Sequence, residues 1–274
     1  MIRLVLALAA LLAAAAMPAA AQDRIPSHCI ALADAAPGLE YVQLAAYGDP
    51  LDRNVARLTY VAHATFLLES AGGLLVATDF TGDLGGIARI PDVVTMNNAH
   101  STHFTGYPDP AIPHVLEGWA TDGKAADHYL DLGEILVRNV PTDVRGRSGT
   151  VRKNGNSIFV FELAGLCIGH LGHLHHEPDP RQYAALGRLD VVMAPVDGGL
   201  TLDLPTMIRV LQRLRSSVVI PMHWFSEGSL QRFLDGISGD FAIDRPGRSF
   251  LDVSLKSLPS RPTVVVLEPA RLLE

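Results

Sequence analysis

The stretch Asp92-Val93-Val94-Thr95-Met96-Asn97-Asn98-Ala99-His100-Ser101-Thr102-His103 joins a short apolar run to two histidines. The apolar part predicts a buried strand over residues 92–96, and the polar part that follows predicts a loop at its end. Imidazoles carried on such a loop are held in place by the sheet behind them. This stretch therefore predicts half of a metal site.

Two further apolar runs end in the same way. The run Ser157–Ile168 leads to His170 and His173, and the run Val218–Met222 leads to His223. Zinc binds three or four nitrogen, sulfur or carboxylate ligands in a nearly tetrahedral arrangement, and a catalytic site leaves one position for water. Three separate strands are thus expected to bring histidines to one place.

Strand-like segments recur along the rest of the chain. Runs rich in Val, Ile, Leu and Phe lie at residues 58–62, 65–69, 74–78, 92–96, 135–140, 157–163, 190–195, 217–222 and 263–267. The first three are joined by short turns, which predicts an antiparallel meander. Later strands alternate with helices expected at 180–186, at 204–214 behind an Asp203 cap, and at 229–237. The order predicts two packed sheets with helices outside, in one α/β (α+β) domain.

The N-terminus has the features of a secretory signal. Met1-Ile2-Arg3 precedes an apolar Leu/Ala run that ends in small residues, which predicts cleavage after Ala21 and a periplasmic or secreted protein. A single membrane anchor is the alternative. We expect a signal peptide at 1–21, a lead-in segment at 22–50 and one folded domain at 51–274, with no stable membrane span after cleavage.

Charge and cysteine content limit the possible partners and the compartment. The 274-residue chain has a net charge of −7, so nucleic acid is not an expected partner. Cys29 and Cys167 would form a disulfide worth about 4–5 kcal/mol in an exported protein, or remain two inert buried thiols. Either role is favoured over a metal-binding thiolate, because side chains alternate along a strand and Cys167 would face away from His170.

Several motifs together resemble the metallo-β-lactamase-fold superfamily, most closely the hydrolase branch that includes ascorbate-6-phosphate lactonase-like proteins. The motifs are Tyr60–Glu69, Ala77–Asp79, Asn98–His103, His170–Leu174 and Ile220–His223. The resemblance runs in order over residues 57–267. It implies a four-layer αββα sandwich and a metal-dependent hydrolase.

The chain departs from the pattern of that family at important positions. In the signature His-x-His-x-Asp-His, Asn98 stands in place of the first histidine and Thr102 in place of the aspartate, while His100 and His103 match. The family's bridging aspartate falls at His173, and its middle histidine falls near Asp143.

The resemblance therefore implies two unequal metal positions. One would have His100, Asn98 and Asp143, which is a weak set of ligands. The other would have His103, His173 and His223, which suit a single zinc ion with one water. We expect one firmly bound zinc and a second metal that is absent or labile.

Catalysis would use a water activated by the metal. Thr102 cannot act as a carboxylate base, so Asp143, His170 or Asp197 is expected to take that role. Asp79 resembles the family's carboxylate that orients a metal ligand, and His63 is expected to support the site. Asp197, which precedes two glycines, fits a turn better than a base.

These observations predict an exported zinc-dependent hydrolase that acts on a small-molecule ester, lactone, amide or phosphoester. The alternative is a catalytically degenerate metal- or ligand-binding protein on the same scaffold. A redox enzyme that holds iron in this site is a third possibility. The sequence leaves the substrate and the oligomeric state open.

Overall fold

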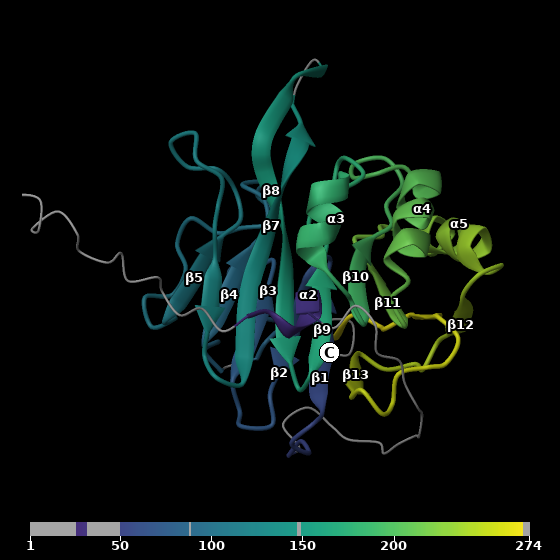
Figure 1. The fold of residues 1–274 in the computed structure, drawn as a ribbon, viewed down its shortest axis with the longest axis horizontal. Coiled ribbons are helices and arrows are strands. Elements are labelled where there is room, and N and C mark those ends of the chain that lie inside the picture. Colours follow the sequence, from purple (N-terminus) through teal and green to yellow (C-terminus); the bar gives the residue numbers. More distant parts are fainter. Residues whose placement is uncertain (1–25, 32–49, 88, 147–148, 271–274) are drawn as a thin grey trace, which may run out of the picture.

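The structure is a computed structural model in which residues 26–31, 50–87, 89–146 and 149–270 are described. The expected signal peptide at 1–21 lies outside the described residues, as does most of the lead-in segment at 22–50. Two β-sheets, one of six strands and one of eight, pack face to face, and helices lie along the outer face of the eight-stranded sheet (Figure 1). This confirms the mixed α/β sandwich.

The first sheet has six strands in the order β13-β1-β2-β3-β4-β5. In chain order they are β1 (Ala56–Ala62), β2 (Thr65–Glu69), β3 (Leu75–Thr78), β4 (Val93–Met96), β5 (His114–Glu117) and β13 (Phe250–Val253). Strands β1, β2 and β3 pair in antiparallel fashion, as the short turns between them predict. Strand β4 joins β3 in parallel.

The second sheet has eight strands in the order β12-β14-β11-β10-β9-β8-β7-β6. They are β6 (Tyr129–Asp131), β7 (Ile135–Arg145), β8 (Val151–Leu163), β9 (Leu166–His170), β10 (Val191–Pro195), β11 (Val218–Met222), β12 (Ala242–Asp244) and β14 (Thr263–Val265). Strands β9, β10 and β11 are parallel, so the loops that follow them leave the same edge of the sheet.

Four helices lie in the described part of the chain: α2 (His28–Ala31), α3 (Pro180–Leu186), α4 (Leu204–Leu214) and α5 (Glu227–Ile237). Side-chain oxygens cap the last three. Asp179 caps α3, Asp203 caps α4 and Ser226 caps α5. Each cap accepts a hydrogen bond from a backbone N–H that has no partner within the helix.

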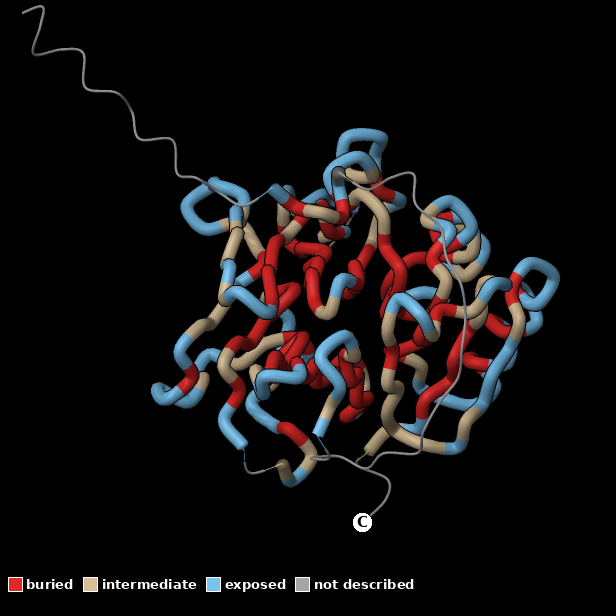
Figure 2. Tube along the Cα trace, turned by 60° about the horizontal axis from the view of Figure 1, so that its bottom comes forward, coloured by how far each residue is buried: buried red, intermediate tan, exposed pale blue. Residues whose placement is uncertain are grey.

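Buried residues follow the strands of both sheets, and exposed residues gather in the connecting loops (Figure 2). The faces of the two sheets that meet are joined by a core that includes Phe66, Phe159 and Ile220. The opposite face of the eight-stranded sheet packs on the helices through residues such as Val192 and Met207.

The outer face of the six-stranded sheet differs from the helical layer that the resemblance implies. In the described part of the chain no helix covers it. Leu67 and Leu75 on this face pack against Phe80, Leu84 and Ile112, which belong to loops. The loops after β3 and β4 therefore cover this apolar face of the sheet in place of helices.

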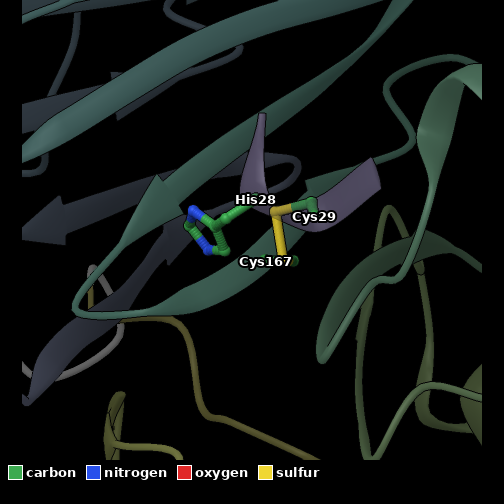
Figure 3. A group of neighbouring side chains, drawn as sticks. All are labelled: His28, Cys29 and Cys167. Carbon is green, nitrogen blue, oxygen red and sulfur yellow. A yellow bond between two sulfur atoms is a disulfide. The ribbon is translucent and has the colours of Figure 1, made fainter. Parts of the chain in front are cut away.

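The segment at 26–31 is attached to the second sheet by a disulfide between Cys29 and Cys167, whose Cα atoms are 5.8 Å apart (Figure 3). Of the alternatives left open by the sequence, the structure therefore has the disulfide. His28 lies beside the two sulfurs, but they are bonded to each other and are not free thiolates for a metal.

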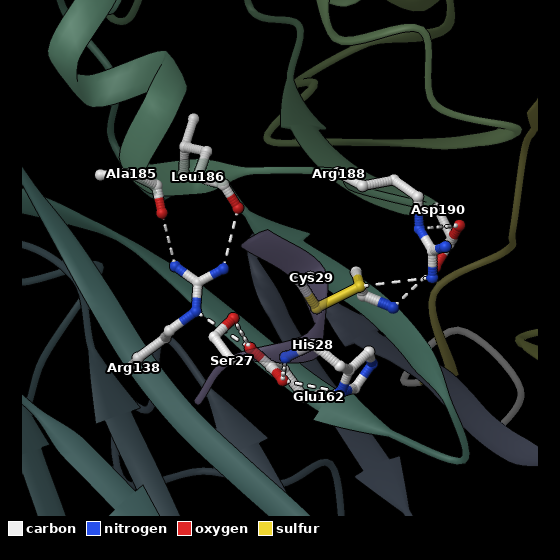
Figure 4. Close-up of a disulfide and its surroundings, with 10 residues drawn as sticks. Ser27, His28, Cys29, Arg138, Glu162, Ala185, Leu186, Arg188 and Asp190 are labelled. Atoms are coloured by element: carbon white, nitrogen blue, oxygen red, sulfur yellow. Dashed lines mark hydrogen bonds and ion pairs between the residues drawn. A yellow bond between two sulfur atoms is a disulfide. The ribbon is translucent and has the colours of Figure 1, made fainter. Parts of the chain in front are cut away.

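Buried polar contacts strengthen this attachment (Figure 4). Glu162 of β8 accepts hydrogen bonds from the hydroxyl of Ser27, from the backbone N–H of His28 at 3.1 Å and from Arg138 at 3.1 Å. Arg138 also donates to the carbonyls of Ala185 and Leu186 at the end of α3. One buried carboxylate thus joins the N-terminal segment, the sheet and a helix.

None of the helices in the described ranges is long and apolar enough to cross a lipid bilayer.

Candidate metal centre

Four histidine rings from four distant segments lie against one another. His63 follows β1, His103 lies on the loop after β4, His173 lies on the loop after β9 and His223 follows β11. The ring centroids are 4.2 Å apart for His63 and His223, 4.5 Å for His103 and His173, and 5.2 Å for His103 and His223. Loops from both sheets therefore build one histidine cluster.

Three of these rings have the donor atoms of a metal site. Ring nitrogens of His63, His103 and His223 all lie within 4.8 Å of one another. The Nε2 atoms of His63 and His103 are buried and have no hydrogen-bond partner among the described residues. A buried polar atom without a partner costs about 1–3 kcal/mol, and a coordinated cation would remove that cost. The three rings therefore fit a metal ion.

Two carboxylates fix the orientation of two of the rings. Asp79 accepts a hydrogen bond from Nδ1 of His103, as the resemblance implied, and Asp197 accepts one from Nδ1 of His223 at 3.0 Å. With the proton on Nδ1, each ring keeps the lone pair of Nε2 free for a metal.

The backbone is left-handed at three residues of this site. The φ angles are 53° at His63, 50° at Asp79 and 57° at His223, although none of them is glycine. A residue held in this region costs about 1–3 kcal/mol unless its surroundings stabilise it. Here the N–H of His223 donates to the carbonyl of His63 at 2.7 Å, and the Tyr60 hydroxyl donates to the same carbonyl at 2.9 Å. These bonds hold the ring of His63 beside the ring of His223.

Burial makes the cluster rings poor bases. Burial, with a smaller contribution from the neighbouring His223, lowers the pKa of His63 to about 4 and that of His103 to about 3. Both rings are therefore neutral near pH 7, which is the form of histidine that binds metals. Burial also raises the pKa of Asp79 to about 6, so its carboxylate is largely ionised at pH 7.

The other sequence-predicted histidines lie around the cluster. His100 is exposed at the rim, with its ring 5.8 Å from that of His173 and its Nδ1 bound to the Thr102 hydroxyl at 3.0 Å. His170 is fully buried: its Nε2 donates to the carbonyl of Ala64 at 2.7 Å, and its Nδ1 accepts from the N–H of Gly172 at 3.1 Å. With both nitrogens engaged, His170 fits a structural role better than the expected role of general base.

Asn98 and Asp143 contact the β7–β8 hairpin. The side-chain oxygen of Asn98 accepts a hydrogen bond from Arg152 at 2.5 Å. Asp143 accepts from Lys153 at 2.6 Å and from the N–H of Asn154 at 2.9 Å. Partial burial acts to raise the pKa of Asp143, but these hydrogen bonds together lower it below its usual value. Within the described part of the chain, the side-chain hydrogen bonds of Asn98 and of Asp143, which is itself part of β7, are thus with residues of this hairpin and not with the four rings.

Sequence reasoning undervalued His63 and Asp197. His63 was expected to support the site, yet its ring lies among the candidate ligands. Asp197 forms the expected turn by accepting from the N–H groups of Gly199, Leu200 and Thr201, and it also binds His223. Burial acts to raise the pKa of Asp197, but these hydrogen bonds hold it well below its usual value. The positions of His63 and Asp197 just after apolar strand-like runs were the sequence signal that could have placed both residues in the site.

The chain is similar to known proteins of one family. The family model described as "Beta-lactamase superfamily domain" matches residues 57–223. A UPF0173 metal-dependent hydrolase from Methanosphaerula palustris is 25% identical over 219 residues, which cover 74% of this chain and 97% of the relative. A relative of the same name from Archaeoglobus fulgidus is 22% identical over 226 residues, which cover 71% of this chain and 98% of the relative.

Two solved structures are also similar. One is a candidate Zn-dependent hydrolase of the metallo-β-lactamase superfamily from Thermotoga maritima. It is 26% identical with a TM-score of 0.55, and the match covers 78% of this chain and 98% of that one. The other is the metallo hydrolase Igni18 from Ignicoccus hospitalis, which is 18% identical with a TM-score of 0.52 over 78% of this chain and 96% of that one. The second likeness concerns the fold alone.

Proposed function

Since this chain belongs to the β-lactamase superfamily domain family, whose model covers residues 57–223, we propose that it is a metal-dependent hydrolase with the histidine cluster as its active site. The observation that carries the proposal is the set of three nitrogens from His63, His103 and His223 within 4.8 Å of one another. The names of its relatives, metal-dependent hydrolases, support the same activity.

Zinc is the metal that we propose for this site. Three imidazoles, two of them oriented by carboxylates, form the donor set of a catalytic zinc that keeps a position for water. A zinc ion polarises a carbonyl or phosphoryl oxygen and lowers the pKa of a bound water to about 7. Of the expected set of His103, His173 and His223, two members stay in this proposal, and His63 takes the third place.

A single ion fits the surroundings better than two. The resemblance implies a second metal position made of His100, Asn98 and Asp143. Arg152 already binds the oxygen of Asn98, and His100 is exposed and bound to Thr102. A cationic guanidinium beside a candidate ligand opposes the binding of a second cation. We therefore propose one zinc ion per chain.

We propose that the substrate is a small ester, lactone, amide or phosphoester and that the protein is exported. The disulfide between Cys29 and Cys167 supports export, because disulfides persist in oxidising compartments. The expected signal at residues 1–21 supports the same location.

The second candidate is a metal- or ligand-binding protein without turnover. It is favoured by Thr102, which stands where the family has a catalytic aspartate and whose hydroxyl is bound to His100 at 3.0 Å. Bound zinc with no hydrolysis of any substrate class would support this candidate.

The test uses the exported chain purified without an affinity tag. We expect about one zinc per chain by elemental analysis, and hydrolysis of chromogenic esters, lactones or phosphodiesters that a chelator abolishes. His103→Ala should lose both zinc and activity. His114→Ala is the matched control, since residue 114 pairs with Val93 at the start of β4, the end of that strand away from the cluster. Activity that survives both the chelator and His103→Ala would contradict the proposal.

A further inference from the structure

A chain of hydrogen bonds leads from the backbone of β7 to the fourth ring of the cluster. The backbone N–H of Arg145 donates to Nδ1 of His175 at 2.7 Å. Nε2 of His175 lies 2.7 Å from Nδ1 of His173. The ring of His173 in turn lies 4.5 Å from that of His103 and 5.2 Å from that of His223. His175 therefore connects a backbone amide to the candidate active site.

The direction of each bond in this chain is determined by its first member. A backbone amide can only donate, so Nδ1 of His175 must hold a lone pair. A neutral imidazole carries one proton, which must then be on Nε2 of His175, and this N–H donates to Nδ1 of His173. By the same reasoning the proton of His173 is on Nε2. The N–H of His173 is thus on Nε2, the ring nitrogen that is not bound to His175.

This is the reverse of the arrangement at the neighbouring rings. Carboxylates hold the protons of His103 and His223 on Nδ1, so those rings present lone pairs of Nε2. For His173 to bind a metal through Nε2, the bond between the two rings would have to reverse, and the bond from the N–H of Arg145 would be lost. His175 would then carry its proton on Nδ1, pointing at the N–H of Arg145.

Further contacts hold the two ends of this chain in place. The guanidinium of Arg145 donates to the carbonyls of Gly199, Leu200 and Thr201 at 3.0, 3.0 and 2.6 Å. The backbone N–H of His173 donates to Asn156 at 2.9 Å. Gly172, with φ of +60°, approaches Asn97 and Asn156 so closely that a Cβ atom there would overlap both. The backbone positions of Arg145 and His173 are therefore well determined.

We propose that His173 is a hydrogen-bond donor to the substrate oxygen that gains negative charge during hydrolysis, and that His175 is the positioning residue that sets its tautomer. The inference rests on the proposed function and assigns the fourth ring a role other than metal binding. An N–H on a ring whose centroid lies 4.5 Å from that of His103 would select substrates with a carbonyl or phosphoryl oxygen. Loss of one such donor typically lowers kcat by about 10²–10³-fold.

The first test measures the tautomer directly. Long-range ¹H–¹⁵N correlation spectra of the zinc-loaded and the zinc-free protein should show His173 protonated at Nε2 in both. In His175→Phe, which removes the donor, the signals of His173 should shift toward a mixture of tautomers. A His173 protonated at Nδ1 in the wild-type protein would overturn the proposal.

The second test separates donation from metal binding. His173→Leu should keep its zinc and lose about 10²–10³-fold in kcat, while His173→Gln, whose amide can still donate, should keep more activity than His173→Leu. His103→Ala serves as the reference for zinc loss. If His173→Leu loses zinc as His103→Ala does, His173 is a ligand and this inference is wrong. If His173→Leu keeps full kcat, the inference is also wrong, although the proposed function stands. If the wild-type protein binds no zinc and hydrolyses nothing, both fail.

Discussion

At the scale of single residues, the partner of each imidazole nitrogen decides what that histidine can do. A carboxylate on Nδ1 leaves Nε2 of His103 and His223 able to bind a metal. His170 is as buried as His103, but backbone groups engage both of its nitrogens. Buried rings of the same residue type thus have different chemistry because their neighbours differ.

The pair of Asp79 and His103 allows a test at this scale. We expect Asp79→Asn to weaken zinc binding by about 10–100-fold, because an amide no longer holds the proton of His103 on Nδ1 with the strength of a carboxylate. Asparagine tolerates the left-handed backbone found at residue 79, so the fold should persist. Competition with a chromogenic chelator measures the affinity. The same change at the exposed Asp203 is the control, and equal affinities in the two variants would contradict the role of Asp79.

At the scale of elements, strand direction brings the site together. Strands β9, β10 and β11 are parallel, and their carboxyl ends lead to His173, Asp197 and His223. Strands β1 and β4 deliver His63 and His103 from the facing sheet. Helix α4 follows the Asp197 turn and packs Met207, Val210 and Leu211 into the core. The stability of this helix is therefore part of what holds the site in place.

The cap of α4 provides a prediction about stability. Asp203 accepts a hydrogen bond from the backbone N–H of Thr206 at 2.9 Å and another from its hydroxyl at 2.9 Å. Asp203→Ala should lower the free energy of unfolding by about 1 kcal/mol, because that N–H loses its partner. Asp203→Asn should change it little, since asparagine caps helices equally well. Urea unfolding at pH 7 measures both, and equal losses would contradict the capping role.

The same cap predicts a pH dependence. The hydrogen bonds from Thr206 lower the pKa of Asp203 in the folded protein. A lowered carboxyl pKa contributes stability that is present above the unfolded value of about 3.9 and is lost as the pH falls through the folded value. The wild-type protein should therefore lose stability relative to Asp203→Asn below about pH 4. Urea unfolding of both proteins between pH 7 and pH 3 tests this, and a constant difference would exclude the effect.

At the scale of the whole molecule, two kinds of contact hold distant segments together. The apolar faces of the two sheets meet in a core that includes Phe66, Phe159 and Ile220. The disulfide joins residues 138 positions apart and attaches the N-terminal segment to β9. Glu162 and Arg138 add buried hydrogen bonds across the same junction.

Loss of this disulfide should destabilise the whole domain. The variant with both Cys29→Ala and Cys167→Ala should lose about 2–5 kcal/mol in free energy of unfolding, largely because the unfolded chain is no longer restricted by the crosslink. Both cysteines are fully buried, so reductant reaches the disulfide when the chain unfolds. The free energy of unfolding in urea is therefore compared with and without reductant. Reductant should weaken the wild-type protein and leave the double variant unchanged. If the wild-type protein is unfolded and refolded in reductant and its free energy of unfolding does not change, the prediction is wrong.

Features that depend on local patterns could be predicted from the sequence. Alternation and apolar runs predicted the β1–β3 meander and most strands of both sheets, and Asp203 predicted the start of α4. The sequence also predicted that histidines follow several strands, because a strand and the loop after it are read from neighbouring residues. Short strands such as β5 and β6, which carry few apolar residues, gave no such signal.

The tertiary structure alone decided which of those histidines meet and which nitrogen each one presents. Asp79 and His103 are 24 residues apart, and Asp197 and His223 are 26 apart, so each pair forms only when neighbouring strands of one sheet align, β3 with β4 and β10 with β11. The pairing of the cysteines and the inclusion of His63 in the cluster were decided in the same way. A hydrogen bond or a metal site depends on distances of a few ångströms between groups far apart in the chain, and only the folded packing sets those distances.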